Sequence, residues 1–271
     1  MKVSLIQLKT APTPAENIIR IRELLQKAKA EGAEIAVLPE MCCCPYENSA
    51  FVRYAMAADA PFLQALAAYA KELELYLVAG SVPLAEEGKI YNASFVYDPN
   101  GDCVAVHRKM HLFDINVTGG QSFMESDTFT PGDEVTTFQT PWGKFGVMIC
   151  YDIRFPELSR LLALDGVRAI FVPAAFNLTT GPAHWELSFR MRALDNQVFM
   201  IGCAPARDMD AAYHAWGHSI VTDPWGSVVE QLDEKEGILT VELDLSRVED
   251  IREQLPLLKH RRTDIYKIVR P

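Results

Sequence analysis

Apolar residues along the chain follow two patterns that alternate. Short runs of Val, Ile, Leu and Phe without regular polar positions are typical of strands buried on both faces. Between them lie longer segments in which apolar residues recur at helical spacing, which indicates amphipathic helices. We predict strands over Val3–Leu8, Ile35–Leu38, Tyr76–Ser81, Gly146–Ile149, Ile170–Val172 and Phe199–Cys203. We predict helices over Ala15–Ala30, Pro61–Leu73, Phe155–Asp165 and His184–Asn196. This alternation predicts an α/β protein whose sheets are covered by helices.

Turn sequences predict that antiparallel strand pairs are mixed into these sheets. They are Asp98-Pro99-Asn100-Gly101 between Ala93–Tyr97 and Cys103–His107, Pro141-Trp142-Gly143-Lys144 before a strand, and Asp223-Pro224-Trp225-Gly226 between Ser219–Val221 and Val228–Gln231. The segment from His111 to Val135 is the longest one without a clear period. Because loops of that length inside compact domains tend to be functional, we expect it to form one wall of an active site.

Length and charge narrow the possible partners. At 271 residues, without a Pro-rich or Gly/Ser-rich linker and without a repeat, the chain is predicted to form one domain over residues 1–271. It carries 26 Lys and Arg residues against 36 Asp and Glu, a formal net charge of -10. This charge repels nucleic acid and anionic membrane surfaces, so we expect neither as a partner.

Targeting and disulfide signals are weak. The segment Met1–Thr13 has a short apolar run broken by Gln7 and Lys9, so we expect no signal peptide. No apolar stretch is long enough to span a bilayer. The six cysteines are too few for a disulfide framework, and adjacent pairing within Cys42–Cys44 would be strained. We therefore expect reduced thiols and a cytoplasmic protein.

Cys150 stands between an apolar run and the start of a helix. Phe145–Ile149 is typical of a buried strand, and Pro156 lies near the first helical turn. The thiol is thus predicted at a strand-to-helix corner, where backbone N–H groups can receive a developing oxyanion. A lone cysteine after such a run is most often a small buried apolar residue. Cys150 therefore needs partners to act as a nucleophile.

Two charged residues follow other predicted strands. Glu40 comes after Ile35–Leu38, and Lys109 comes after Val104–Arg108. A solvated loop glutamate and an ordinary exposed lysine remain the alternatives on residue type alone. Taken together, however, an acid, a base and a thiol at strand ends supply the roles that acyl transfer requires.

Several blocks of the chain resemble the nitrilase, or carbon–nitrogen hydrolase, superfamily. The catalytic blocks are Leu38-Pro39-Glu40, Arg108-Lys109-Met110-His111-Leu112-Phe113-Asp114 and Cys150-Tyr151-Asp152-Ile153-Arg154-Phe155-Pro156-Glu157. The blocks that resemble the omega-amidase branch are Phe176–Glu186, Leu194-Asp195-Asn196-Gln197, Pro205-Ala206-Arg207-Asp208 and Trp216-Gly217-His218-Ser219. The resemblance covers nearly the whole chain. It implies a four-layer α-β-β-α sandwich, dimerised through a helical face, with neither metal nor organic cofactor.

The resemblance also implies a role for each catalytic residue. Cys150 would be the nucleophile and Glu40 the general base. Lys109 and the backbone N–H of Tyr151 would stabilise the oxyanion. Glu125, in the long loop, matches a second glutamate of the family and would orient these groups or relay a proton; its alternative is a surface loop acid.

Arg154 is the main candidate for substrate selection. It lies four residues after Cys150, on the helical side of the corner, where a guanidinium can hold a substrate carboxylate bidentately. The alternative is a helix-cap contact or an ion pair, for example with Asp152 or Glu157. Further substrate-binding candidates are Tyr151, Phe176, Thr180 and Tyr46, of which the last is favoured for plain packing. The resemblance implies hydrolysis of the ω-amides 2-oxoglutaramate and 2-oxosuccinamate, with the amide of deaminated glutathione as the alternative substrate.

Two other classes of function are open to the same residues. His107 and His111, four residues apart, together with Cys42–Cys44 would allow a metal site. No Cys-x-x-Cys or His-Glu-x-x-His pattern supports it, so we predict no metal. The other alternative is a non-enzymatic binding protein with an inert thiol. The favoured prediction remains an amidase whose ligand is a small-molecule amide.

Overall fold

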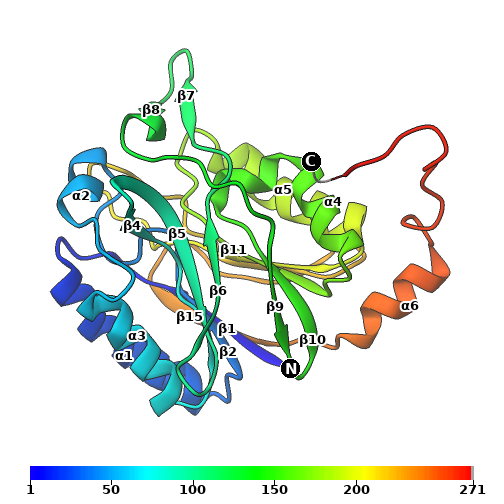
Figure 1. Ribbon diagram of the computed structural model, residues 1–271, viewed down its shortest axis with the longest axis horizontal. Helices are drawn as coiled ribbons and strands as arrows, with labels where there is room; N and C mark the ends of the chain where they lie inside the picture. Colours follow the sequence, from blue (N-terminus) through cyan, green and yellow to red (C-terminus); the bar gives the residue numbers. More distant parts are fainter. Residues whose placement is uncertain (270–271) are drawn as a thin grey trace.

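The chain folds into four layers, in which two β-sheets pack face to face and helices cover their outer faces (Figure 1). The structure is a computed structural model and describes residues 1–269. The α-β-β-α sandwich expected from the sequence is therefore confirmed.

The first sheet has seven strands in the order β15-β1-β2-β3-β5-β4, with β6 beside β5. Its strands are β1 (Lys2–Gln7), β2 (Ile35–Val37), β3 (Tyr76–Val78), β4 (Val82–Glu86), β5 (Lys89–Tyr97), β6 (Cys103–Arg108) and β15 (Gly237–Glu242). β1, β2 and β3 pair in parallel, and the other pairs are antiparallel. Helices α1 (Pro14–Ala30) and α3 (Pro61–Glu72) lie in the crossovers that parallel pairing requires.

The second sheet has six strands in the order β14-β13-β12-β11-β10-β9. Its strands are β9 (Thr136–Thr140), β10 (Gly143–Val147), β11 (Ala169–Pro173), β12 (Phe199–Cys203), β13 (Ile220–Thr222) and β14 (Val228–Gln231). Helices α4 (Pro156–Leu164) and α5 (Gly181–Asn196) connect the parallel strands β10, β11 and β12. In Figure 1 they lie on the side of the molecule opposite to α1 and α3.

Strands of both sheets are buried on two faces. Leu5 of β1 points between the sheets, where it joins Phe145 and Phe171 of the second sheet in one apolar cluster. The next residue, Ile6, belongs to the cluster under α1 and α3. Because successive side chains of a strand point to opposite faces, a strand between two cores needs apolar residues at every position. This explains the continuous apolar runs in the sequence.

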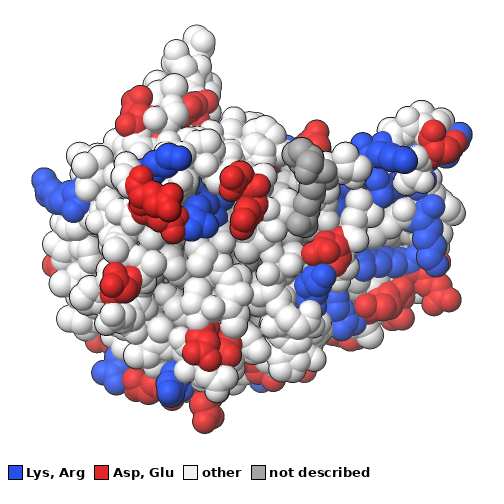
Figure 2. Space-filling model, in the orientation of Figure 1, with Lys and Arg blue, Asp and Glu red and all other residues white. Residues whose placement is uncertain are grey.

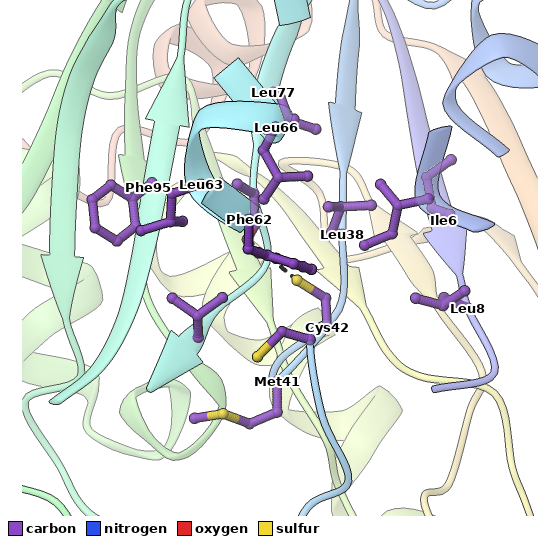
Figure 3. Close-up of a cluster of buried hydrophobic side chains, with 14 of the residues drawn as sticks. Ile6, Leu8, Leu38, Met41, Cys42, Phe62, Leu63, Leu66, Leu77 and Phe95 are labelled. Carbon is purple, nitrogen blue, oxygen red and sulfur yellow. Dashed lines mark hydrogen bonds between the residues drawn. The ribbon is translucent and has the colours of Figure 1, made fainter. Parts of the chain in front are cut away.

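The core under α1 and α3 includes a run of thiols. Figure 3 shows Leu66 of α3 close to Leu77 of β3, with Cys42 in the same cluster. All three residues of Cys42–Cys44 are buried there. These cysteines therefore fill space as small apolar residues.

Most predicted elements are confirmed, and two differences at element ends have a local cause. Helix α1 begins at Pro14 because Thr13 and Glu16 form a reciprocal capping box. The strand predicted over Gly146–Ile149 is displaced to Gly143–Val147. Its early residues pair with β9 in a hairpin, and the chain leaves the sheet after Val147.

Several elements were not predicted. The long segment from His111 to Val135 contains the hairpin β7 (Asp114–Asn116) and β8 (Ser122–Met124), which projects from the body in Figure 1. Polar side chains in these short strands hide their period. The helices α2 (Asn48–Arg53) and α6 (Ser246–Gln254) were also missed.

The visible surface carries both signs of charge. On the face shown in Figure 2, basic side chains lie beside acidic ones, and the tip of the projecting hairpin is uncharged. This face therefore offers no extended basic surface to a polyanion. Within residues 1–269, no helix combines the length and the apolarity needed to cross a bilayer.

Candidate active site

The predicted catalytic side chains lie together at strand ends of the two sheets. Glu40 follows β2, Lys109 follows β6 directly, and Cys150 follows β10. Their exposed fractions are 1%, 1% and 4%, respectively. Blocks far apart in the sequence thus form one buried cluster.

Cys150 occupies a strained turn. After β10 the chain enters a 3-10 turn over Cys150–Arg154, and α4 begins at Pro156. The φ angle of Cys150 is 45°, in the left-handed region that costs a residue with a side chain about 1–3 kcal/mol. The predicted corner is confirmed, with a 3-10 turn before the helix. Strain of this kind persists only where surrounding contacts enforce it, and it often marks a functional residue.

The turn that carries Glu40 depends on a glycine of the neighbouring strand end. Gly80 has a φ of 56°, and a Cβ atom there would lie 2.2 Å from the carbonyl oxygen of Pro39. Any side chain would collide with the backbone next to Glu40. Gly80 therefore permits the close approach that places the carboxylate.

Lys109 is held between two buried carboxylates. Its Nζ lies 2.9 Å from Oε1 of Glu40 and 2.8 Å from Oε2 of Glu125. Glu125 is fully buried, and its Oε2 also accepts the N–H of Phe113 at 2.7 Å. The alternative of a surface loop acid for Glu125 is therefore wrong. One ammonium group therefore contacts two buried acidic side chains.

Further donors hold the carboxylates in place. Asn92 Nδ2 donates to Glu40 Oε1 at 2.9 Å, and the Tyr46 hydroxyl donates to Glu125 Oε1 at 2.6 Å. The N–H of Ala175, which follows β11, donates to Glu40 Oε2 at 2.8 Å. Glu40 thus contacts both sheets, and Tyr46 does more than pack.

The protonation of the cluster follows from burial and charge. Burial raises the pKa of the Cys150 thiol well above its usual value, and the Glu40 carboxylate adds to this against the attraction of Lys109. Burial also raises the pKa of Glu40, although Lys109 opposes it. Burial alone would lower the pKa of Lys109, but Glu125 and Glu40 outweigh it, so the pKa is raised. The resting site therefore combines a neutral thiol with an ammonium, and a thiolate forms when a base accepts the proton.

Arg154 extends from the same turn as Cys150. Its Nη1 lies 3.1 Å from His184 Nδ1. The guanidinium lies over the ring of Phe176, at 4.7 Å from the centroid, and 5.5 Å from that of Tyr151. Two of the predicted substrate-binding residues therefore contact this guanidinium through their aromatic faces.

The acids considered as ion-pair partners of Arg154 do not pair with it. Asp152 contacts His107 and His111, and among residues 1–269 Glu157 forms no ion pair. Burial lowers the pKa of Arg154, against the opposite effect of the Cys150 thiol and of the Tyr151 and Tyr213 hydroxyls. A half-buried guanidinium without a carboxylate partner is suited to bind a carboxylate ligand.

Thr180 differs from the other predicted substrate-binding residues. It lies just before α5 and is buried, and its hydroxyl donates to Asn177 Oδ1 at 3.1 Å. The structure therefore gives this hydroxyl a structural partner within the loop.

The residues of the alternative metal site are separated. His107 and His111 direct ring nitrogens to Asp152, whereas Cys42–Cys44 lie in the core under α1 and α3. In the described part of the chain, no group of three or more His, Cys, Asp or Glu side chains could hold a metal ion.

Sequence reasoning missed three groups around the site. Asn92 could have been noticed, because Asn is uncommon within a strand such as Lys89–Tyr97. Tyr213, whose hydroxyl donates to the carbonyl of Ala175, lies in a loop without any motif. The N–H of Ala175 belongs to the backbone, so the residue type does not predict its hydrogen bond to Glu40.

Comparisons with known proteins agree with this geometry. The carbon-nitrogen hydrolase family model matches residues 2–253. The chain is 45% identical over 267 residues to omega-amidase NIT2-A of Xenopus laevis and 43% identical over 267 residues to omega-amidase NIT2 of Homo sapiens, and each match covers 98% of this chain and 97% of the relative. The crystal structure of Saccharomyces cerevisiae Nit3, a member of branch 10 of the nitrilase superfamily, has a TM-score of 0.89 at 40% identity and covers 97% of this chain and 96% of that chain. The fold, the buried cluster and these full-length matches lead to one conclusion: the chain belongs to the carbon-nitrogen hydrolase family, within the nitrilase superfamily.

Proposed function

We propose that the chain is an omega-amidase that hydrolyses short dicarboxylic acid monoamides, such as 2-oxoglutaramate and 2-oxosuccinamate, to the dicarboxylate and ammonia. Relatives named omega-amidases match 98% of its length at 43% and 45% identity. The observation within this chain that carries the proposal is Arg154, which has no carboxylate partner among residues 1–269 and extends from the same turn as Cys150. A substrate with a carboxylate at its far end would supply that partner.

The first half-reaction forms a thioester. Glu40 accepts the proton of Cys150 while the sulfur attacks the amide carbonyl carbon. The neutral resting thiol makes this base necessary. Lys109 and the backbone N–H of Tyr151 stabilise the oxyanion. When the intermediate collapses, the C–N bond breaks, Glu40 returns its proton to the leaving nitrogen, and ammonia departs.

The second half-reaction hydrolyses the thioester. Glu40 removes a proton from water, the oxygen attacks the thioester carbonyl, and the C–S bond breaks as Cys150 regains a proton. Glu125 acts as an orienting residue in this scheme. Its oxygens accept from Tyr46, Phe113 and Lys109, so its role is to hold the ammonium in place.

Ammonia release from 2-oxoglutaramate and from a neutral amide of equal length tests the proposal. Arg154→Leu should lose about 1.5–3 kcal/mol of binding to the carboxylate, which is roughly ten- to more than a hundredfold in kcat/KM. The neutral amide should be affected much less. Arg22→Leu, on α1, is the matched control, because its guanidinium also lies over an aromatic ring, that of Tyr69, and it should leave kcat/KM for both substrates unchanged.

Three outcomes would revise the proposal. A parallel loss on both substrates would make Arg154 structural. A wide preference of the wild type for deaminated glutathione would assign the chain to that amidase activity. Failure to hydrolyse any of these amides would contradict amidase function.

The outer face of α5 favours a homodimer, which we propose as the assembly. Leu187, Met191 and Leu194 follow one another at helical spacing and are 62%, 45% and 43% exposed. An apolar stripe of this kind is suited to pair with its own copy about a two-fold axis. Leu187→Asp should convert dimer to monomer in sedimentation velocity, and a monomeric wild type would contradict the proposal.

We also propose one domain for residues 1–271 and a cytoplasmic location. The core between the sheets takes residues from β1 to α6, including Val3 and Val248, which supports one folding unit. The six cysteines are free, which supports a reducing compartment. Limited proteolysis that yields two stable fragments would contradict the first proposal.

A further inference from the structure

The carboxylate of Asp152 is buried and accepts four hydrogen bonds. Oδ1 accepts from the backbone N–H of His111 at 3.0 Å and from its ring Nδ1 at 2.8 Å. Oδ2 accepts from the backbone N–H of Ile149 at 3.0 Å and from His107 Nε2 at 2.9 Å. Both oxygens are therefore saturated, and Asp152 has no capacity left for a substrate.

The four donors come from the two segments that carry the catalytic side chains. His107 and His111 lie two residues before and two residues after Lys109. Ile149 immediately precedes Cys150. The first segment continues β6 of the first sheet, and the second follows β10 of the second sheet. The Asp152 carboxylate thus connects the segment that carries Lys109, next to the first sheet, with the turn that carries Cys150, next to the second sheet.

The two histidines are held by further contacts. His107 is fully buried, and its Nδ1 lies 2.9 Å from the hydroxyl oxygen of Thr136. The ring of His111 stacks on Phe155, with centroids 3.7 Å apart. Each ring can therefore direct an N–H to Asp152 in a single orientation.

We propose that Asp152 is a positioning residue, which holds the Lys109 ammonium and the Cys150 thiol at their working separation. The proposal rests on the catalytic roles proposed above for these two groups. Misplacement by about 1 Å costs on the order of a hundredfold in rate, because the reacting atoms no longer meet in the attack geometry.

The charge of Asp152 fits this role. Burial alone would raise the pKa of Asp152, but the hydrogen bonds from His107 and His111 outweigh it and hold the pKa well below its ordinary value. The carboxylate therefore stays ionised at neutral pH, and both oxygens remain acceptors.

Asp152→Asn tests the hydrogen bonds that connect the two segments without changing the size of the side chain. The amide offers a single acceptor oxygen, and its NH₂ group must face the donors of either His111 or Ile149 and His107. The hydrogen bonds to one of the two segments are therefore lost. We expect kcat on 2-oxoglutaramate to fall about a hundredfold. KM should stay within about threefold, because the Arg154 guanidinium contacts His184 and Phe176 rather than Asp152.

Asp223→Asn is the matched control. Asp223 is also a buried acid whose Oδ1 accepts two backbone N–H groups, from Trp225 and Ser227, in the turn between β13 and β14. Both variants should lower Tm. Asp152→Asn alone should lower kcat, and alone should shift the pH profile of Cys150 alkylation by iodoacetamide.

His107 offers a second test through conservative rescue. His107→Gln keeps an N–H donor near the position of Nε2, whereas His107→Leu removes it. The Gln variant should retain kcat within about threefold, and the Leu variant should lose about tenfold or more.

Each outcome bears on one proposal. A kcat of Asp152→Asn within threefold of wild type, with a Tm loss like that of Asp223→Asn, would overturn the positioning role. If Asp152→Asn does not fold, equal kcat values for the two His107 variants would overturn it. A wild type without amidase activity would contradict the proposed function instead, and the alkylation profile would then decide whether Asp152 positions the thiol.

Discussion

Among the buried thiols, two sets differ in their neighbours, the run Cys42–Cys44 and Cys150. Cys42 and Cys43 are fully buried, and Cys150 is 4% exposed. Burial raises the pKa of all three thiols. Cys42 directs its sulfur to the carbonyl of Ala79, whereas Cys150 lies beside a carboxylate and an ammonium.

Burial therefore does not distinguish Cys150, the proposed nucleophile, from the other buried thiols, whereas its carboxylate and ammonium neighbours do. Cys42 lies only two residues after Glu40 in the sequence. The intervening Met41 has a φ of 52°, so the chain reverses between the carboxylate and the thiol. Cys42 therefore enters the core under the helices, while Glu40 faces the site.

The largest expected effect separates the two sets directly. Cys150→Ala should lower kcat by about 10⁴–10⁶-fold, because it removes the proposed nucleophile. Mass spectrometry of an acid-trapped reaction of the wild type should place the acyl adduct on Cys150. An adduct on one of the thiols of Cys42–Cys44 would contradict the assignment of Cys150 as the nucleophile.

Removing the ammonium should make Cys150 resemble the other buried thiols. Lys109→Met should lower kcat by about 10²–10³-fold and the free energy of unfolding by about 3–5 kcal/mol, since two carboxylates lose their counter-charge. Lys144→Met, at an exposed ion pair with Asp165, is the control and should cost less than about 1 kcal/mol. Full activity of the Lys109 variant would remove the ammonium from the mechanism.

The base should be visible in the pH profile. Burial raises the pKa of Glu40 above its ordinary 4.5, and only the ionised form can accept a proton. As pH falls through this raised pKa, kcat/KM should drop about tenfold per pH unit, with a midpoint above 4.5. Circular dichroism at each pH separates this loss from unfolding. A midpoint at or below the ordinary value would contradict the assignment of Glu40 as base.

The inert thiols should affect stability rather than rate. Cys42→Ala, Cys43→Ala and Cys44→Ala should each leave kcat unchanged and lower the free energy of unfolding by about 0.5–1.5 kcal/mol, as other small deletions in a core do. Urea unfolding measures this change. A tenfold loss of kcat in any of these variants would show that the buried Cys42–Cys44 run contributes to the reaction.

Cys103 gives the smallest expected effect. It is the exposed thiol of β6, so Cys103→Ser should change stability by less than about 0.5 kcal/mol. It should also remove the fast phase of thiol titration in the folded protein. Persistence of that phase would mean that one of the buried thiols is accessible.

Prediction from the sequence succeeded where burial on both faces leaves a simple trace. Runs such as Phe199–Cys203 are apolar at every position, so their strands were found. The pairing of β15 with β1 could not be found in this way, because the two strands are far apart in the chain. The strands of the hairpin β7–β8 have three residues each, with an apolar residue, Ile115 or Phe123, at the centre, so they left no periodic signal.

The site was predictable to the extent that strand ends and family blocks reveal it. Glu40, Lys109 and Cys150 were placed together on those grounds, and their catalytic roles remain predictions. The burial of Glu125 could not be predicted, since contacts with Lys109 and Phe113 from other segments create it. Asp152 was noticed only as a possible partner of Arg154, because its saturation by donors is a property of the fold.

The hydrogen bond from the N–H of Ala175 to Glu40 has a consequence for how the protein unfolds. It joins the carboxylate after β2 to the backbone after β11, and these strands belong to different sheets. A partly unfolded form that keeps one sheet would lack half of the site. Enzymatic activity should therefore be lost in the same unfolding transition in which the two sheets separate.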